Sequence, residues 1–285
     1  MPVTSYSLTS GTANASSGTT ASIVSTGNRL QLMSVHGAFS SSAGAPQTLT
    51  ITDSATTWAL VNTQGTYIDT TNYWLFSYLY RAMPASTTAS RTISITSAGN
   101  TFAELSWSIE EFDSVDTTGT YGSGAIVQSA VAQVSYGGTL SITATLAAFG
   151  STNNATFGMV GGGYYATVTY TEGSGFTRGN FQHSTNYTSI LTEFKNTNDT
   201  TVDFSISNSQ HLAAIAVEIK YAAAATAPTY WNKQSLFRPG KRGNPLTSFK
   251  KTDQGNTPAT ATSIVFRKTL SSIGTKSGSR QTHNT

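Results

Sequence analysis

The stretch that decides the fold is residues 102–112, Phe-Ala-Glu-Leu-Ser-Trp-Ser-Ile-Glu-Glu-Phe. Leu105, Trp107 and Ile109 occupy every second position, and the residues between them are polar. This alternation is typical of a β-strand with one buried and one solvated face. It predicts that the three apolar side chains point inward. The side chains predicted to point outward are those of Glu104, Ser106, Ser108 and Glu110.

The same alternation recurs along the chain up to residue 221. It predicts further strands, each with an apolar inner face and a hydroxyl-rich outer face, near residues 49–52, 92–96, 140–146 and 201–206. In residues 211–221 (HLAAIAVEIKY), Ile215, Val217 and Ile219 recur at period two and predict the last core strand. No long segment has a helical period, so the helices that connect parallel strands are missing. We therefore predict an all-β fold, an antiparallel β-sandwich or jelly roll.

The composition indicates a packed protein with an uncharged polar surface. Only 10% of the 285 residues are charged and the net charge is +3, which excludes a highly charged disordered chain and a coiled coil. The absence of cysteine excludes a disulfide scaffold. No apolar run approaches the roughly 18 residues of a membrane helix, and no secretory signal is recognisable. We expect a soluble protein that does not enter a membrane.

The charges divide the chain at residue 221. Residues 1–221, which we call the body, hold six basic and twelve acidic residues, a net charge of −6. Residues 222–285, which we call the arm, hold ten basic residues and one acid, a net charge of +9. The body is predicted to form the β-sandwich, with residues 1–18 as an N-terminal strand or arm. The C-terminal arm is rich in turn signals and has no core pattern, so we expect an extended segment that gains order from a partner.

The arm is predicted to dock on neighbouring subunits. Its residues Ser263–Leu270 (SIVFRKTL) could form one strand that adds to a neighbour's sheet edge. Acidic faces of neighbours, including copies of the body, would attract it. Nucleic acid is the weaker alternative, because regularly interleaved aromatic residues are missing. The arm residues predicted to contact a partner are Trp231, Phe237, Arg238, Lys241, Arg242, Lys250, Lys251, Phe266, Arg267 and Lys268.

Two parts of the body resemble a β-sandwich domain that recurs in bacteriophage virion proteins and in some bacterial surface or secreted proteins. The first part contains TITDSATTW at residues 50–58, RTISITSAGN at 91–100 and SWSIEEFDSVDTT at 106–118. The second contains TEGSGFTR at 171–178, LTEFKN at 191–196 and AIAVEIK at 214–220. The resemblance covers about residues 20–221. It implies a structural or adhesive role, and it carries no catalytic residues.

Glu110, Glu111, Asp113 and Asp116 form the densest acidic cluster. It admits a glycosidase pair made of Glu110 and Glu111, a Ca²⁺ site built on Asp113 and Asp116, or a solvated strand end. Neighbouring strand residues point to opposite faces, which argues against a site shared by Glu110 and Glu111. We prefer the solvated strand end. The four histidines lie near no nucleophile motif, and His36 is expected to be a hydrogen-bonded sheet residue. We predict no enzyme, no metal and no cofactor.

The aromatic residues divide into a set predicted to be buried and a set predicted to be exposed. Trp74, Phe76, Tyr78 and Tyr80 alternate on one strand and are predicted to belong to the core. Gly161–Gly163 are predicted to form a loop that presents Tyr164 and Tyr165 for contact with a glycan. Residues 173–179 (GSGFTRG) are predicted to form a turn rather than a phosphate loop, because no helix follows them. Three further tyrosines predicted to be exposed are Tyr67, Tyr121 and Tyr136.

These patterns favour a bacteriophage virion structural protein, either a capsid decoration or a tail or baseplate accessory subunit. Its expected location is the virion, and its expected partners are other virion proteins and copies of itself. The alternative is a carbohydrate-binding or receptor-binding adhesin module that recognises a host surface glycan. An enzyme, specifically a glycosidase using Glu110 or Glu111, ranks third.

Overall fold

The computed structural model describes residues 2–40, 45–68, 73–137, 139–163, 168–184 and 188–222. The chain divides into two units, Met1–Thr226 and Ala227–Thr285, and every described residue belongs to the first. The described residues form sixteen β-strands and one 3₁₀ turn at Ser123–Ala125, with no α-helix among them. The all-β prediction is confirmed. Within the part of the chain described, we find no helix with the length and apolar character needed to cross a membrane.

The first eight strands form two antiparallel sheets, which we call lobe 1. A five-stranded sheet has the order β1-β8-β3-β6-β5, and a three-stranded sheet has the order β2-β7-β4. The strands are β1 (Thr4–Ala13), β2 (Ser17–Thr19), β3 (Leu30–Ser40), β4 (Leu49–Thr52), β5 (Ala59–Ile68), β6 (Tyr73–Ala82), β7 (Ser94–Ser97) and β8 (Phe102–Asp113).

The second eight strands, which we call lobe 2, repeat this topology. Their sheets have the orders β9-β16-β11-β14-β13 and β10-β15-β12, which are the orders of lobe 1 with eight added to each strand number. Eight strands in two antiparallel sheets are the architecture of a jelly roll. The body is therefore two tandem jelly-roll-like lobes, where the sequence predicted one sandwich. The strands are β9 (Ile126–Val134), β10 (Ser141–Thr145), β11 (Ala155–Gly163), β12 (Tyr170–Glu172), β13 (Thr177–His183), β14 (Ser189–Lys195), β15 (Thr201–Ile206) and β16 (His211–Ile219).

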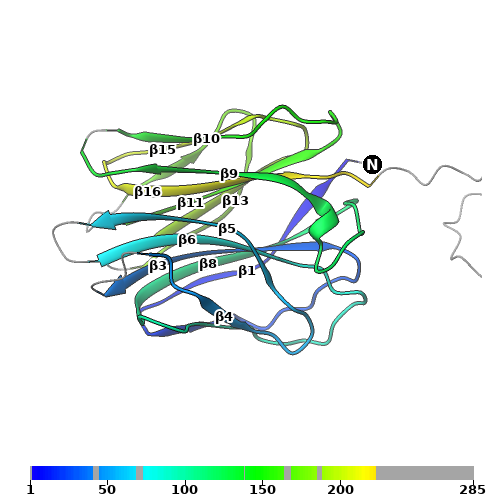
Figure 1. The fold of residues 1–285 in the computed structure, drawn as a ribbon, viewed down its shortest axis with the longest axis horizontal. Helices are drawn as coiled ribbons and strands as arrows, with labels where there is room; N and C mark the ends of the chain where they lie inside the picture. Colours follow the sequence, from blue (N-terminus) through cyan, green and yellow to red (C-terminus); the bar gives the residue numbers. More distant parts are fainter. Residues whose placement is uncertain are drawn as a thin grey trace, which may run out of the picture. The chain divides into compact units, whose positions relative to one another are not determined.

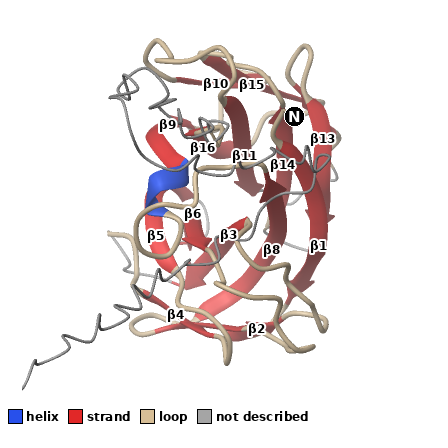
Figure 2. Ribbon diagram, turned by 90° about the vertical axis from the view of Figure 1, so that its right-hand side faces the viewer, coloured by secondary structure: helices blue, strands red, loops and turns tan. Residues whose placement is uncertain are grey.

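The four sheets stack as layers, with the two five-stranded sheets in the middle (Figures 1 and 2). Each gap between layers holds its own apolar cluster. Ile95 of β7 packs with Val35 of β3 inside lobe 1, and Phe204 of β15 packs with Val160 of β11 inside lobe 2. The cluster between the lobes joins Leu32, Leu79 and Phe112 of lobe 1 to Phe157, Met159 and Ile215 of lobe 2. Strands β8, β3, β11 and β16 are thereby covered on both faces.

This double covering corrects the prediction for β8. Leu105, Trp107 and Ile109 do point into lobe 1. The opposite side chains, those of Glu104, Ser106, Ser108 and Glu110, are at most 1% exposed, so the prediction that they face solvent is wrong. They face the second five-stranded sheet instead, because lobe 2 occupies the side on which the sequence pattern placed water. The strand predicted at residues 211–221 is confirmed as β16, which is buried throughout.

Two other strand predictions have definite outcomes. The alternating aromatic residues of β6 belong to the core of lobe 1, as predicted, with Tyr78 and Tyr80 stacked at 6.5 Å between ring centroids. Leu140, predicted to be an inward-facing strand residue, lies just before β10 and is 48% exposed. Residues 173–176 form the predicted turn, in which the Phe176 amide donates to the Gly173 carbonyl over 3.1 Å.

The connection between β4 and β5, which lies in the stretch TITDSATTW that resembles the family motif, is fixed by a buried ion pair. Asp53, just after β4, accepts hydrogen bonds from the Arg91 guanidinium at 2.6 and 3.0 Å, from the Ala55 amide at 2.9 Å and from the Trp58 indole at 3.0 Å. Both charged side chains are at most 5% exposed. Burial alone would raise the pKa of Asp53, but these hydrogen bonds outweigh it and hold the pKa below its ordinary value.

Candidate functional site

The interface between the lobes is a polar seam, not only an apolar core. At its centre the His36 Nδ1 atom lies 2.9 Å from the Ser77 hydroxyl, which donates to the Ala213 carbonyl of lobe 2 over 3.0 Å. Burial lowers the pKa of His36 to about 3, so the ring is neutral at physiological pH. His36 is a sheet residue, as predicted, but only one ring nitrogen is hydrogen-bonded, since Nε2 has no partner.

Glu110 lies in the same seam and is buried, with 1% of its surface exposed. Its carboxylate accepts hydrogen bonds from the Thr192 hydroxyl of lobe 2 and from Ser5 at 3.2 Å. Burial raises the pKa of Glu110 against the opposing effect of these hydrogen bonds. The prediction of a solvated strand end is therefore wrong for Glu110, and also for Glu111, which is 2% exposed. The two carboxylates point to opposite faces of β8, as predicted, and form no pair.

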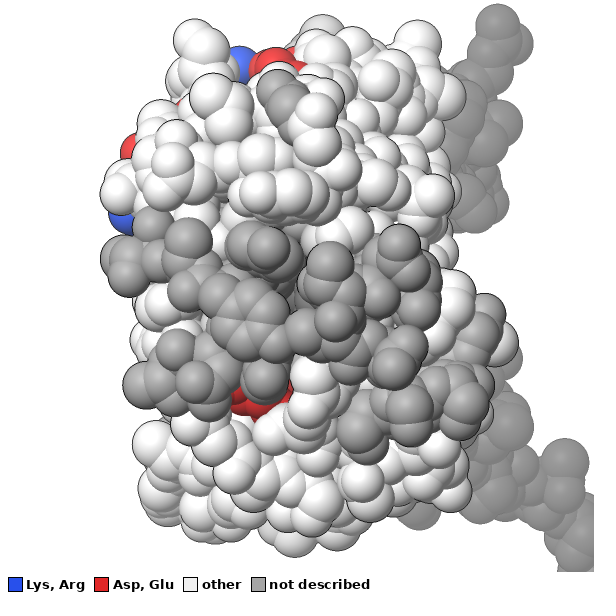
Figure 3. All heavy atoms as spheres, turned by 90° about the vertical axis from the view of Figure 1, so that its left-hand side faces the viewer, with Lys and Arg blue, Asp and Glu red and all other residues white. Residues whose placement is uncertain are grey.

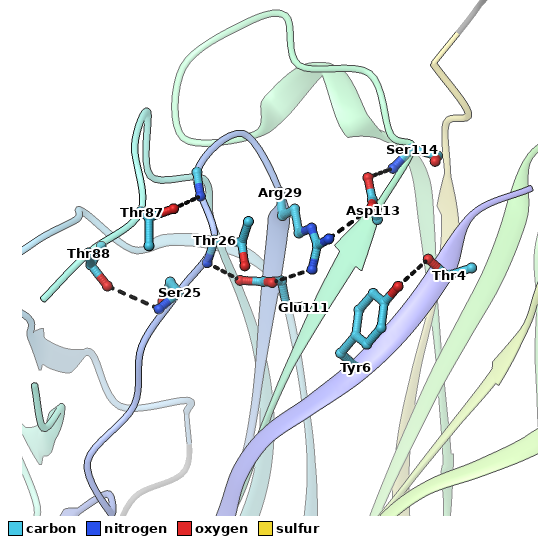
Figure 4. A network of polar contacts seen from close by, with 11 residues as sticks. Thr4, Tyr6, Ser25, Thr26, Arg29, Thr87, Thr88, Glu111, Asp113 and Ser114 are labelled. Carbon is cyan, nitrogen blue, oxygen red and sulfur yellow. Dashed lines mark hydrogen bonds and ion pairs between the residues drawn. The ribbon is translucent and has the colours of Figure 1, made fainter. Parts of the chain in front are cut away.

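Glu111 and Asp113 are held by one arginine on the other face of β8 (Figure 4). Arg29 donates to the Glu111 carboxylate and to the Asp113 carboxylate, each over 3.0 Å. The Thr26 amide donates to Glu111 over 2.7 Å, and the Arg29 guanidinium lies 4.8 Å from the centre of the Tyr6 ring. The acidic residues at the end of β8 thus bind the loop that precedes β3, through Thr26 and Arg29.

The carboxylates considered for Ca²⁺ have cationic partners. Asp113 pairs with Arg29, and Asp116 pairs with Lys220 at 2.7 Å. The hydrogen bond from Lys220 lowers the pKa of Asp116 to about 2. The described part of the chain contains no group of three or more acidic or histidine side chains arranged to hold a metal. Asp113 and Asp116 therefore organise the start of the β8–β9 connection and the end of β16.

A polar cleft lies where the edges of the two central sheets meet at β1 and β13. It has a volume of about 390 Å³, and Glu110 lies at its floor. Thr4, Ser5 and Ser7 line one side, and Arg178 lines the other. Across the edges, the Ser7 hydroxyl donates to the Asn180 side chain over 2.9 Å. Hydroxyls beside a carboxylic acid and a guanidinium suit a small polar ligand rather than an apolar one.

The opposite pair of edges, β5 and β9, presents a different surface. Figures 1 and 2 show these two strands side by side at the border of their sheets. Asn62 donates to the Ser129 hydroxyl over 3.0 Å, and Gln64 donates to the Gln133 side chain over 2.8 Å. Between and beside these amides three apolar side chains are exposed: Leu60 (47%), Val127 (50%) and Val131 (39%). We call this surface the β5–β9 edge face.

A groove adjoins the start of β9 at the place where the described chain ends. Its volume is about 870 Å³, and Ile126, Val127, Asn154, Glu218 and Tyr221 are among the residues that line it. The end of the body is fixed beside it. The Tyr221 amide donates to the Asn154 side chain over 3.1 Å, and the Ala222 amide donates to the Ser114 carbonyl over 2.9 Å. The described chain therefore ends at a defined point, Ala222, next to this groove.

Several predicted contact residues lie outside the described residues: Tyr164, Tyr165, Trp231, Phe237, Arg238, Lys241, Arg242, Lys250, Lys251, Phe266, Arg267 and Lys268. Gly161–Gly163, predicted to be loop residues, are instead buried in β11. A Cβ atom at Gly161 would meet His36 of the other central sheet, and one at Gly162 would meet Tyr170 and Leu212 of lobe 2. Tyr121 and Tyr136 are about half exposed, as predicted. The end of the body seen in Figure 3 carries few charged residues on its described surface.

The sequence analysis missed the seam and the β5–β9 edge face. One signal was available for the seam: β11 and β16 are apolar on both sides, which indicates sheets covered on both faces. No family model, curated protein or solved structure matches this chain.

Proposed function

We propose that this chain is a bacteriophage virion structural protein that docks on neighbouring subunits through its arm. The observation that carries the proposal is the fixed exit of the chain beside the 870 Å³ groove, followed by a segment with a net charge of +9. The body itself has a net charge of −6, so copies of it attract the arm at long range.

Three further features support a structural role. Jelly rolls are common in viral capsid proteins. Hydrogen bonds from Ser77 to the Ala213 carbonyl and from Thr192 to Glu110 join the two lobes. The surface is uncharged and hydroxyl-rich, and the resemblance to virion β-sandwich domains covers both lobes. The capsid, tail and baseplate are all compatible locations.

Truncation after Ala225 tests this proposal. All apolar clusters of the body come from residues 3–221, so the truncated chain should fold with an unchanged circular dichroism spectrum. We expect it to be absent from purified particles when it replaces the full chain during infection. A matched control keeps the arm but replaces Lys276 and Arg280, which lie outside the predicted contact set, by Gln. Incorporation of the truncated chain at the level of this control would overturn the proposal.

The second candidate function is a carbohydrate-binding or receptor-binding adhesin module. The polar cleft between β1 and β13 favours it, because hydroxyls, an amide and a carboxylic acid are the groups that recognise sugars. A glycan array with the full chain tests this function. Binding that is lost in Arg178→Ala, or in the Tyr164→Ala/Tyr165→Ala double variant, would support it, and a blank array with folded protein would count against it.

A further inference from the structure

We propose that the β5–β9 edge face receives the segment Ser263–Leu270 from a second copy of this chain, added as a strand to the outer edge of β9. This inference rests on the proposed function, since it names the surface on which the arm docks. Its first basis is an open edge: β9 is the last strand of its sheet, and no strand among the described residues pairs with its outer side. Unpaired N–H and C=O groups of an edge strand are a template for another chain.

The sequence of β9 makes this edge unusually receptive. Its residues, IVQSAVAQV, include no charge and no proline, which are the devices that protect edges from pairing. The only register shift in its pairing with β16 lies at its first residues, so residues Gln128–Val134 form a regular ladder. Seven regular residues are enough to pair with an eight-residue segment.

β5, the edge of lobe 1 that lies beside β9, has a register shift between Leu60 and Asn62 and belongs to the same β5–β9 edge face. The long edges at the opposite border are less suitable. β1 has a register shift between Ser7 and Thr9, and β13 has one between Arg178 and Phe181, which also places a charge on that edge. Bulges of this kind interrupt pairing in mid-strand. The outer strands of the three-stranded sheets, β2, β4, β10 and β12, have only three to five residues each. β9 is thus the edge of lobe 2 that offers the longest regular run without a charge.

The chemistry of the β5–β9 edge face fits the segment. Leu60 and Val127 lie two residues before the hydrogen-bonded pair Asn62 and Ser129, and Val131 lies two residues after Ser129. An apolar line therefore runs beside the edge, broken only by neutral amides and hydroxyls. In SIVFRKTL, Ile264 and Phe266 share one face of the predicted strand and can cover this line. Arg267 and Lys268 follow them, and no basic residue of β5 or β9 opposes them.

The location of the groove gives the occupant. Ile126 and Val127, the first residues of β9, line the groove beside which each copy's chain leaves its body at Ala222. Residues 223–262 separate that exit from the segment, and an extended chain rises up to about 3.3 Å per residue, so a neighbouring body is within reach. We assign the second copy as the occupant because docking on neighbours is the role proposed for the arm.

The chain contains no cysteine, so single thiols can test the pairing. The experiment mixes full-length Val131→Cys carrying one affinity tag with full-length Phe266→Cys carrying another, followed by mild oxidation. We expect a disulfide-linked dimer of the two chains, at least about tenfold above a control with Thr177→Cys, because a disulfide needs Cβ atoms about 4 Å apart. Thr177 is an exposed residue of β13, at the opposite edge of the same sheet.

Three further comparisons make the result decisive. Directly opposite residues of paired strands lie within disulfide distance but diagonal neighbours do not, so Ile264→Cys should cross-link to Val131→Cys less than Phe266→Cys does, and should cross-link instead to Ser129→Cys or Gln133→Cys on the same face of β9. Val265→Cys, on the other face of the segment, should cross-link to none of these. Val131→Lys should abolish cross-linking through Gln133→Cys without a change in melting temperature, since Val131 is partly exposed and a lysine protects an edge. A yield equal to the Thr177→Cys control, or cross-links only within one chain of a Val131→Cys/Phe266→Cys double variant, would overturn the inference. If arm truncation still prevents incorporation in that case, the proposed function stands and the arm docks elsewhere.

Discussion

Asn62 of β5 donates a hydrogen bond of 3.0 Å to Ser129 of β9, and so joins an edge strand of lobe 1 to the edge strand of lobe 2 that lies beside it. At the other border, the Ser7 hydroxyl of β1 donates to Asn180 of β13. The two central sheets are therefore tied along both sides as well as through the seam. Both lobes have the same strand order, so the polar seam joins two copies of one architecture. The packing of the seam and the ion pairs around it determine how the stability and the ionisation of the protein respond to single substitutions.

The first prediction concerns the closest approach of the lobes. A Cβ atom at Gly161 of β11 would overlap the His36 ring of β3. Since both residues are buried in sheets, neither can move freely, and Gly161→Ala should destabilise the protein by about 1–3 kcal/mol, the usual cost of overpacking. Thermal unfolding followed by circular dichroism measures this. Gly150→Ala is the matched control, because a Cβ there meets nothing within 4 Å; equal melting temperatures for the two variants would contradict the packing described.

The second concerns the buried ion pair between Asp53, in the connection between β4 and β5, and Arg91. Replacing Asp53 by Asn leaves the buried Arg91 charge without its carboxylate, which typically costs about 3–5 kcal/mol. Asp113→Asn removes the charge of a partly exposed carboxylate that pairs with Arg29, and should lower the free energy of unfolding by less than about 1 kcal/mol. Urea unfolding of both variants gives the comparison. A smaller loss of unfolding free energy for Asp53→Asn than for Asp113→Asn would show that the connection between β4 and β5 does not depend on this ion pair.

The third concerns the pH dependence of stability. Burial, with nearby acids, raises the pKa of Glu193 in β14 to about 8. In the unfolded chain a glutamate ionises near pH 4.3, so between about pH 5 and 8 the native state holds a proton that the unfolded state has lost. Stability should therefore fall as pH rises through this range, by at most about 1.4 kcal/mol per pH unit from this group.

Glu193→Gln removes the titrating proton and should flatten that decline. Urea unfolding at pH 5, 6.5 and 8 measures the slope. Asp116→Asn serves as the control, because the pKa of Asp116 is about 2 and Asp116 is not among the acids that raise the pKa of Glu193, so its replacement should not flatten the slope between pH 5 and 8. A slope that is the same in Glu193→Gln as in the unmodified protein would mean that Glu193 is ionised in the native state.

The fourth concerns the exit of the chain. Lys220 is the first cause of the low pKa of Asp116, which is about 2. Lys220→Met should raise the carboxylate titration midpoint of Asp116 toward the ordinary aspartate value, and Lys195→Met, whose partner is Asp199, should leave it unchanged. Carbon-detected NMR titration of the carboxylates resolves both. An unchanged titration midpoint for Asp116 in Lys220→Met would show that Lys220 and Asp116 do not form this ion pair in solution.

The all-β class could be predicted from the sequence because strand alternation depends only on neighbouring residues. The second face of β8 could not be predicted correctly. Ser106 is hydrogen-bonded to Thr188 of lobe 2, Ser108 to Asn180 and Glu110 to Thr192. Polar residues that face a polar sheet have the same sequence pattern as residues that face water. Which of the two surrounds them depends on partners some 70 to 80 residues away along the chain.

The repeated topology of the two lobes and the strand conformation of residues 161–163 could not be predicted from the sequence, for related reasons. Corresponding strands share an order but little sequence: β8 reads FAELSWSIEEFD where β16 reads HLAAIAVEI. The glycines of β11 resemble a loop, yet Gly161 is required by the His36 ring of the other lobe, a contact that no local pattern contains. The β5–β9 edge face likewise depends on which strands end a sheet, and that follows only from the topology.

The central claim is that the body sits on a phage particle and is attached through its arm. Cryo-electron microscopy of purified virions tests it most directly, with particles that carry the full chain compared with particles from infections that supply only residues 1–225. We predict two-lobed densities at defined positions on the particle, each connected to a neighbouring subunit, and their loss with the truncated chain. Particles that lack such densities with the full chain, or that keep them with the truncated chain, would contradict the claim.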